Sequence, residues 1–266
     1  MFSFFQTKPL LDETSIEWMH ATFTWASEQF GESFFQEDTQ LILPNDRFFP
    51  GRADSYQAMA ELIFGHVKKH AGMTHWHFEL IPNTACLPEH LEQQALDSQN
   101  IPTPLRSTQS LPTVSGKPLP VIYDPSQVNN PSAMIAGFAH ALAHYLGTQT
   151  TVAPPGGTEN WPHITELLAV YMGFGLMFAN SAYTSPKSCA SCSNTGNKRE
   201  AYLSQFDITY ALAIFAAKKD LTAKQVRPYL NKPLQGFFKH ALKEAQTNPM
   251  AAISHQPHNE IQSSHK

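Results

Sequence analysis

The sequence predicts an α+β protein in which a small mixed N-terminal part, with strands, packs on a mainly helical C-terminal half. Two observations predict this class. Short segments with strand character, 74–81 and 120–124, occur early in the chain, whereas later apolar residues recur at helical spacing. The 266 residues are therefore expected to form a mixed part (1–124), a helical part (125–245) and a disordered polar tail (246–266).

Composition narrows the possible partners and compartments. Apolar residues make up 42% of the chain, which allows a sizeable core, and the net charge of -4 argues against nucleic acid as a partner. The first residues lack the features of a signal peptide, and three cysteines cannot pair completely, so a cytoplasmic location is expected. The most apolar stretch, 167–179, is 13 residues long. A membrane span needs roughly 20, so this stretch is predicted to be a buried core helix.

In the N-terminal part, apolar spacing predicts a helix over 14–31 and another over 55–71, which Gly72 closes. A short strand is predicted over 41–43. Alternation over 74–81 predicts a further strand with polar residues on one face. That polar face carries His75, His77 and Glu79.

The proline-rich stretch 82–119 predicts a long irregular loop of the kind that often shapes a binding cleft. Further helices are predicted after the strand at 120–124. They span 131–146, 162–181, 204–219, 222–230 and 233–245. Ser204 and Asp207 have the spacing of a capping box at the start of one of them.

The helix over 131–146 has clear end signals: Asn130 suits the cap, Pro131 the first helical position, and Gly147 the exit. It is apolar almost all round, which predicts a buried helix. One stripe consists of small residues and histidines that would let another element approach closely. Its members are Ala133, Gly137, His140 and His144.

His140 and His144 lie four residues apart, so they share one helix face and can direct ring nitrogens at the same metal ion. A buried imidazole pair needs polar partners, and one divalent cation satisfies both rings. The chain contains a comparison pair of the same spacing, His66 and His70, with lysines between them. That pair is interpreted as surface histidines, and His75 and His77 as exposed polar residues.

A peptidase-type zinc site takes three protein ligands and leaves a fourth position for water. The segment after the histidine helix offers Glu159, His163 and Glu166. Pro162 suits a helix start, which places His163 and Glu166 on one face. Glu166 is the preferred third ligand, and His163 is an alternative ligand, an outer contact or a substrate contact. The competing interpretation is that Glu166 only stabilises its helix N-terminus.

These residues resemble the gluzincin branch of zinc metallopeptidases, in which a glutamate from a later helix joins two helical histidines. The matching residues are His140, His144 and Glu166. The stretches 138–146 and 165–175 also resemble an uncharacterised bacterial group with an H-E-L-A-H core. The resemblance covers about 130–217. It implies a zincin-like fold, one Zn²⁺, and hydrolysis of a peptide or protein substrate by metal-activated water.

Ala141 departs from that pattern, because the family has its general-base glutamate there. Alanine cannot move a proton, and the loss of a general base typically costs roughly 10²–10⁴-fold in rate. Three explanations stay open: an inactivating substitution, a natural pseudoenzyme, or a different base such as Glu159 or His163. The alternative functions are a non-catalytic zinc protein that binds a peptide or partner, and a purely structural helical protein.

Other candidates are less specific. Cys189 and Cys192 have the spacing of a metal knuckle, a local disulfide or incidental thiols, and Cys86 lies far away in sequence. Gly156 and Gly157 predict a turn that carries Glu159 toward the site. Three tyrosines are further candidates. Tyr145 is expected to face away from the metal. Tyr171 and Tyr202 could stabilise an oxyanion, but no motif places them at the site.

Overall fold

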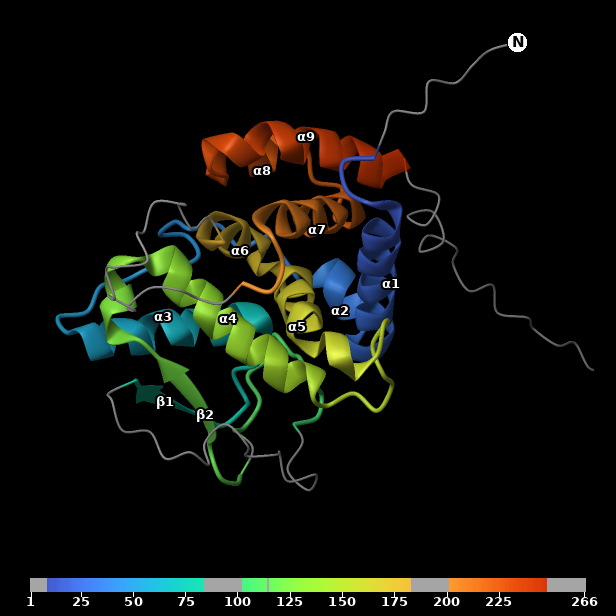
Figure 1. Ribbon diagram of the computed structural model, residues 1–266. Coiled ribbons are helices and arrows are strands. Elements are labelled where there is room, and N and C mark those ends of the chain that lie inside the picture. Colours follow the sequence, from blue (N-terminus) through green and yellow to red (C-terminus); the bar gives the residue numbers. More distant parts are fainter. Residues whose placement is uncertain (1–8, 84–101, 114, 183–200, 248–266) are drawn as a thin grey trace, which may run out of the picture.

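The computed structural model describes residues 9–83, 102–113, 115–182 and 201–247, and these residues form a mainly helical molecule with one small sheet (Figure 1). The α+β class is confirmed. The elements are α1 Glu13–Phe30, α2 Glu32–Glu37, α3 Tyr56–Ala71, β1 Phe78–Pro82, β2 Leu119–Tyr123, α4 Pro131–Gly147, α5 Trp161–Ala169, α6 Gly175–Ser181, α7 Gln205–Lys218, α8 Ala223–Val226 and α9 Lys232–Thr247. The cysteines at 86, 189 and 192 lie outside the described residues.

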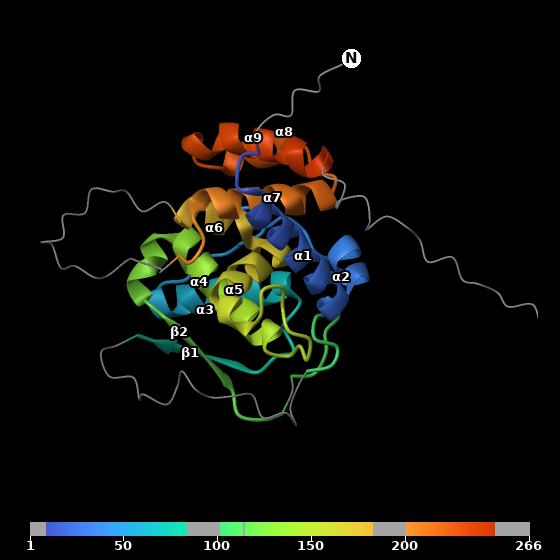
Figure 2. The same ribbon diagram turned by 45° about the vertical axis from the view of Figure 1, so that its right-hand side comes forward.

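The sheet and the C-terminal helices lie at opposite ends of the molecule (Figures 1 and 2). Strands β1 and β2 pair in parallel, with Phe78 opposite Leu119. The predicted strand over 74–81 begins only at Phe78. His75 is buried rather than exposed, because its Nε2 bonds the carbonyl oxygen of Pro104 at 2.7 Å. This contact holds the chain in a turn before the strand starts.

The N-terminal helices follow their sequence signals. Helix α1 buries the predicted apolar stripe, and the side chain of Asp12 caps its first turn through Ser15 N. Ser55 caps α3 through Ala58 N. Gly72 ends α3 with φ +72°, a left-handed conformation that glycine adopts without steric cost.

Two predicted elements differ around Gly173. The segment 41–43 is extended but is not a strand, because the backbone N–H of Ile42 donates to Gly173 O at 3.0 Å rather than to a sheet. The predicted single helix over 162–181 is interrupted at Val170–Phe174, where the helix widens into a π turn. Gly173 has φ +100°, and a Cβ there would lie 2.1 Å from Gln40 O. The close approach of the 41–43 segment therefore requires glycine at this position.

A single buried cluster runs from Ile16 to Ala245, while the division of the chain into 1–124 and 125–245 stays a prediction. Helices α5 and α6 lie at its centre. The helical run Thr158–Ser181 is long and apolar enough to cross a membrane, but 89% of its most apolar window is buried inside the protein. The predicted burial of 167–179 is confirmed, although the π turn divides this stretch between α5 and α6.

The C-terminal helices close the other side of this core. The capping box of Ser204 and Asp207 is formed at the start of α7. Helix α9 packs along α7. The predicted helix over 222–230 is shorter, because α8 tightens into a 3₁₀ turn at Arg227–Tyr229 that contains Pro228. Proline cannot donate the backbone hydrogen bond that an α-helix needs there.

Candidate metal-binding site

The histidine stripe of α4 lies on the accessible face of the helix. The opposite face is fully buried and consists of Ile135, Phe138, Leu142 and Leu146. Gly137 and His144 are exposed, and His140 is half-buried. The expectation of a helix buried all round is therefore wrong for this stripe. No atom of the described residues lies within 4 Å of a Cβ built on Gly137, so no described element approaches there.

His144 is held against the next helix. The indole Nε1–H of Trp161 donates to Nδ1 of His144 at 3.2 Å, and the two ring centroids are 6.3 Å apart. Gly147 allows this contact, because a Cβ there would lie 2.6 Å from the Trp161 ring. Partial removal from water lowers the pKa of His144 below its usual value, which favours the neutral imidazole.

The hydrogen bond from Trp161 also selects the tautomer of His144. If Nδ1 accepts this hydrogen bond, the neutral ring carries its own proton on Nε2. A metal ligand that coordinates through Nε2 normally has the opposite tautomer, with Nδ1 donating to an acceptor. Coordination through Nδ1 would use the lone pair that accepts the indole N–H, so metal binding at His144 through either nitrogen requires this hydrogen bond to break.

Glu166 is fully buried on α5, and its Oε2 accepts from the backbone N–H of Leu203 at 2.9 Å. It is the sixth residue of the helix, so it lies beyond the first turn. A role limited to the helix N-terminus does not explain it, because that effect falls off within the first turn. Its carboxylate instead connects α5 to the segment that leads into α7.

The predicted shared face of His163 and Glu166 is present, because both contact the 202–203 segment. The ring of His163 lies between Trp18, at 6.5 Å between centroids, and Tyr202, at 5.8 Å. Its Nδ1 is buried and has no hydrogen-bond partner among the described residues. His163 lies about 200° around the helix axis from Trp161, the residue that contacts His144. It therefore faces away from the α4 stripe.

Glu159 is exposed in the short 3₁₀ turn Thr158–Asn160. The predicted glycine turn before it is present, since Gly157 N donates to Pro154 O at 2.9 Å. Among the described residues, the partners of His144 are Trp161 and Tyr145, and Glu159 is not one of them.

As a donor set, two imidazoles and a carboxylate suit zinc. Their arrangement is incomplete, however: across the described ranges, no group of three or more His, Cys, Asp or Glu side chains lies close enough to hold a metal ion. The accessible α4 face offers two imidazoles, and the Glu166 carboxylate is engaged by Leu203 N. The described side chains therefore do not form a complete three-ligand zinc site.

The comparison histidines have structural partners. His66 and His70 are half-buried rather than on the surface. Their Nε2 atoms bond the carbonyl oxygens of Pro50 and Phe48, at 2.8 and 2.7 Å. His77 is exposed as predicted, and its Nδ1 bonds Gly116 O.

The three tyrosine candidates have other partners. The hydroxyl of Tyr145 donates to Pro120 O at 2.7 Å and so points to the sheet, while its ring lies edge-on to His144, with the centroids 5.7 Å apart. Tyr171 is buried and stacks on Phe35, with the ring centroids 4.6 Å apart. Burial raises its pKa to about 12. Tyr202 is exposed over His163.

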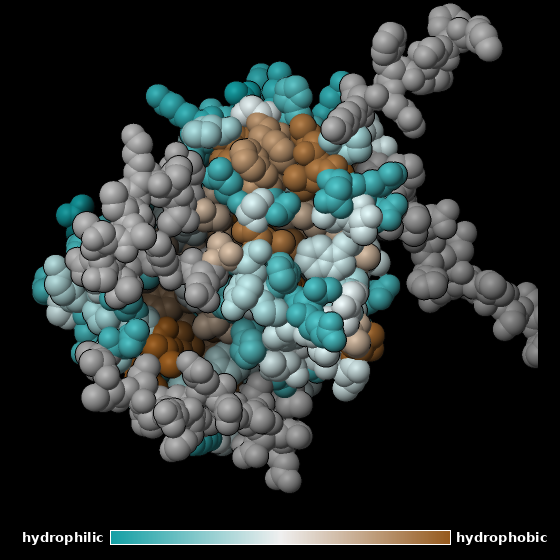
Figure 3. All heavy atoms as spheres, viewed as in Figure 1, coloured by the Kyte–Doolittle hydropathy of each residue, from teal (hydrophilic) through white to brown (hydrophobic). Residues whose placement is uncertain are grey.

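A hollow continues the α4 stripe toward the sheet, and the sequence pattern did not reveal it. It has a volume of about 150 Å³. Ile122, Met134 and Phe138 form its apolar side, and Asp124 and Gln127 also line it. Figure 3 shows apolar side chains at the bottom of a depression in this region. Gly137 lies one helical turn from His140, so the hollow and the histidines share one face.

The β2 edge beside the hollow has unpaired backbone groups. Leu119 N donates to His77 O and Tyr123 O accepts from Asn83 N, so alternate β2 residues bond β1. The N–H and C=O of Ile122 therefore point to the other edge. Neither has a partner among the described residues.

No known protein family matches this chain, and no curated protein or solved structure matches it either.

Proposed function

We propose that this chain is a zinc metallopeptidase-like protein with a zincin-like fold, which holds Zn²⁺ through His140, His144 and Glu166. The observation that carries the proposal is the accessibility of the histidine stripe on a helix that is otherwise buried. Small residues continue that stripe on the open side of α4. An accessible histidine pair beside a concave apolar surface is an arrangement typical of a ligand-binding site.

A peptide suits the cleft beside α4. The free backbone groups of Ile122 can pair with an extended peptide, as in recognition by strand addition. The hollow lined by Ile122 and Phe138 is apolar and accepts a hydrophobic side chain of that peptide. A peptide in this position passes along the stripe toward His140.

Glu166 is the preferred third ligand because its buried carboxylate lies on α5, the helix that packs against α4. It shares the face of His163, so its side chain must turn toward the two histidines to reach them. To coordinate zinc, its carboxylate must share or give up the hydrogen bond from Leu203 N. His163 faces Trp18 and Tyr202, and Glu159 is exposed on its turn, so both fit less well as ligands or as a replacement base.

Ala141 is half-buried beside His140 and has no group that moves a proton. When bound, zinc supplies a Lewis acid and an activated water, but turnover also needs a base to take the proton. Metal binding does not depend on this position, because the family's glutamate there is not a ligand. The chain is therefore expected to bind zinc and peptide with little turnover.

The second candidate function is a non-catalytic zinc protein that holds a peptide or protein partner in the same cleft. Ala141 favours this function, because the hollow beside α4 is present while the position of the family's general base holds an alanine. A cytoplasmic location is proposed for both functions.

The test is Ala141→Glu with zinc loaded and a peptide library as substrate, with Ala141→Gln as a control of similar size. We expect chelator-sensitive cleavage by Ala141→Glu, faster by roughly 10²–10⁴-fold than by the control. Zinc binding without cleavage by either variant would favour the non-catalytic function. If neither variant nor the unchanged protein binds zinc, the proposal is wrong.

A further inference from the structure

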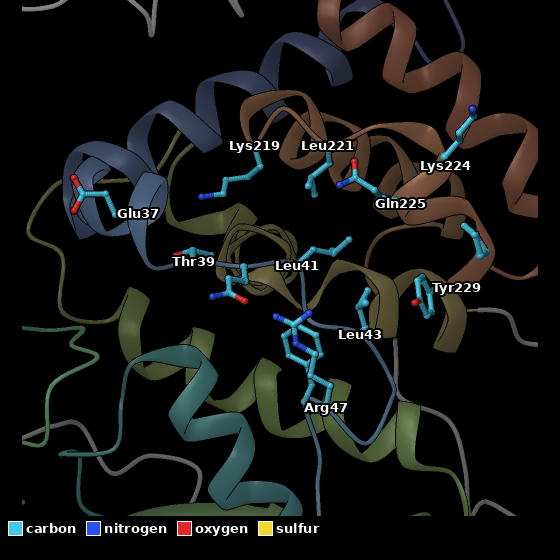
Figure 4. Close-up of a pocket in the computed structure, with 13 residues that line it drawn as sticks. Glu37, Thr39, Leu41, Leu43, Arg47, Lys219, Leu221, Lys224, Gln225 and Tyr229 are labelled. Atoms are coloured by element: carbon cyan, nitrogen blue, oxygen red, sulfur yellow. The ribbon is translucent and has the colours of Figure 1, made fainter.

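A second cavity lies between the N-terminal segment 37–48 and the segment 219–229, which follows α7 (Figure 4). Its volume is about 580 Å³, within the range of roughly 300–1,000 Å³ that is usual for small-molecule sites. None of its lining residues belongs to α4 or α5, so it is separate from the histidine face.

The floor of this cavity is apolar because the 41–43 segment is extended. Side chains alternate along an extended chain, and Ile42 points inward to the core with 1% of its surface exposed. Leu41 and Leu43 therefore point the other way, and both line the cavity. Leu221 contributes apolar surface from the opposite wall, as Figure 4 shows.

Arg47 supplies a positive charge at one edge of the cavity. In Figure 4 its guanidinium points from that edge toward Leu41. Among the described residues Arg47 has no ion-pair partner, and its guanidinium lies over the Phe48 ring, 5.7 Å from the ring centroid. A guanidinium without a carboxylate partner is available to an anionic ligand, and its planar fork suits a carboxylate or phosphate.

The other charged residues of the lining leave the field positive. Lys219 Nζ already donates to Phe35 O at 2.8 Å and to Gln36 O at 2.6 Å, which ties α7 to α2. Lys224 lies at the rim, and Figure 4 places Glu37 at the far end from Lys224. Three cationic side chains thus face one acidic side chain.

We propose that this cavity binds a small amphipathic anion, with its carboxylate or phosphate on Arg47 and its aliphatic chain on Leu41, Leu43 and Leu221. The apolar floor removes the aliphatic chain from water, which favours binding in proportion to the apolar surface that is buried. Since the two walls come from segments far apart in sequence, the bound ligand also connects the N-terminal segment to the C-terminal helices.

Calorimetric titration of the full chain tests this with three probes of equal chain length: decanoate, decyl phosphate and neutral decanol. We expect saturable binding of at least one anion near one equivalent, and binding of decanol weaker by about tenfold or more. Binding of decanoate alone would assign a carboxylate ligand, and binding of decyl phosphate alone a phosphate ligand. If neither anion binds saturably, the proposal is overturned.

Matched variants locate the site. Arg47→Gln should weaken anion binding about tenfold, and Leu43→Trp should fill the cavity and abolish binding. Lys239→Gln, an exposed charge change on α9 outside the cavity, should leave the affinity unchanged. Equal affinities of the unchanged protein and Arg47→Gln would contradict the proposal. Thermal unfolding of each variant, with and without decanoate, gives a second readout, since a ligand of the folded state raises Tm.

Discussion

Two histidine pairs with the same spacing have different surroundings in this protein. On α3, His66 and His70 bond loop carbonyl oxygens, and the ring of His70 also packs on Phe48 and Phe49, with centroids 5.3 and 5.7 Å away. On α4, His144 is exposed and accepts a hydrogen bond from the Trp161 indole, whereas His140 is half-buried. The spacing of two histidines therefore defines a shared face, and the neighbouring segments decide which partners the rings take and how far the face is exposed.

The largest effect should come from Glu166, the proposed third zinc ligand. Glu166→Gln keeps an oxygen that can accept from Leu203 N but removes the charge that zinc prefers. We expect zinc affinity to fall by roughly 100-fold or more, because the loss of even an outer partner costs about 10–100-fold. Calorimetry of zinc binding, with thermal unfolding measured alongside, is the check. Reduced stability with unchanged zinc affinity would make Glu166 a structural residue only.

The α3 pair should affect stability instead. His70→Ala removes the hydrogen bond to Phe48 O and the ring contacts, and should lower the free energy of unfolding by about 1–2 kcal/mol. His144→Ala removes the longer hydrogen bond from Trp161 at an exposed position and should lower it by less, about 0.5–1 kcal/mol. Urea titrations of both variants make the comparison. A larger loss for His144→Ala would reverse the roles of the two pairs.

The pH dependence of stability is a second test of the structural role of His70 on α3. Burial, the largest cause, lowers the pKa of His70 below 6.5, so the folded state binds its proton less readily than the unfolded state. The contribution is complete above the unfolded pKa and is lost as the pH falls through 6.5 toward the folded value. His70→Ala should therefore lose less stability between about pH 7 and pH 5 than the unchanged protein.

The smallest effect concerns the indole that holds His144. Trp161→Phe keeps an aromatic ring beside Gly147 but removes the N–H that donates to Nδ1. This hydrogen bond is worth about 0.5–1.5 kcal/mol, so zinc affinity should rise by several-fold when zinc no longer competes with it. Trp25→Phe, whose indole N–H bonds Val152 O, is the matched control. A decrease in zinc affinity with Trp161→Phe would show that the indole supports the metal site.

Much of the fold follows from local signals. Caps, apolar spacing and glycine exits predicted α1, α3, α4 and α7, because each signal acts within one helical turn. The break at Gly173 was not predictable, because it depends on Gln40 O approaching from a distant segment. The burial of His75 likewise depends on Pro104, 29 residues further along the chain.

The surroundings of the candidate site residues could not be predicted from the sequence. The motif nominates His140, His144 and Glu166, whereas the indole on His144 and the backbone N–H on Glu166 come from segments that no local pattern connects. The hollow beside β2 and the cavity around Arg47 were missed for the same reason. Both are formed by side chains from elements distant in sequence.

The most direct test of the account is a zinc titration of the full chain and of two double variants, His140→Ala/His144→Ala and His66→Ala/His70→Ala. We predict that the unchanged protein and the α3 variant bind close to one equivalent, and that the α4 variant binds none. Equal zinc binding by both double variants, or no binding by the unchanged protein, would contradict the assignment of the α4 face as a metal site.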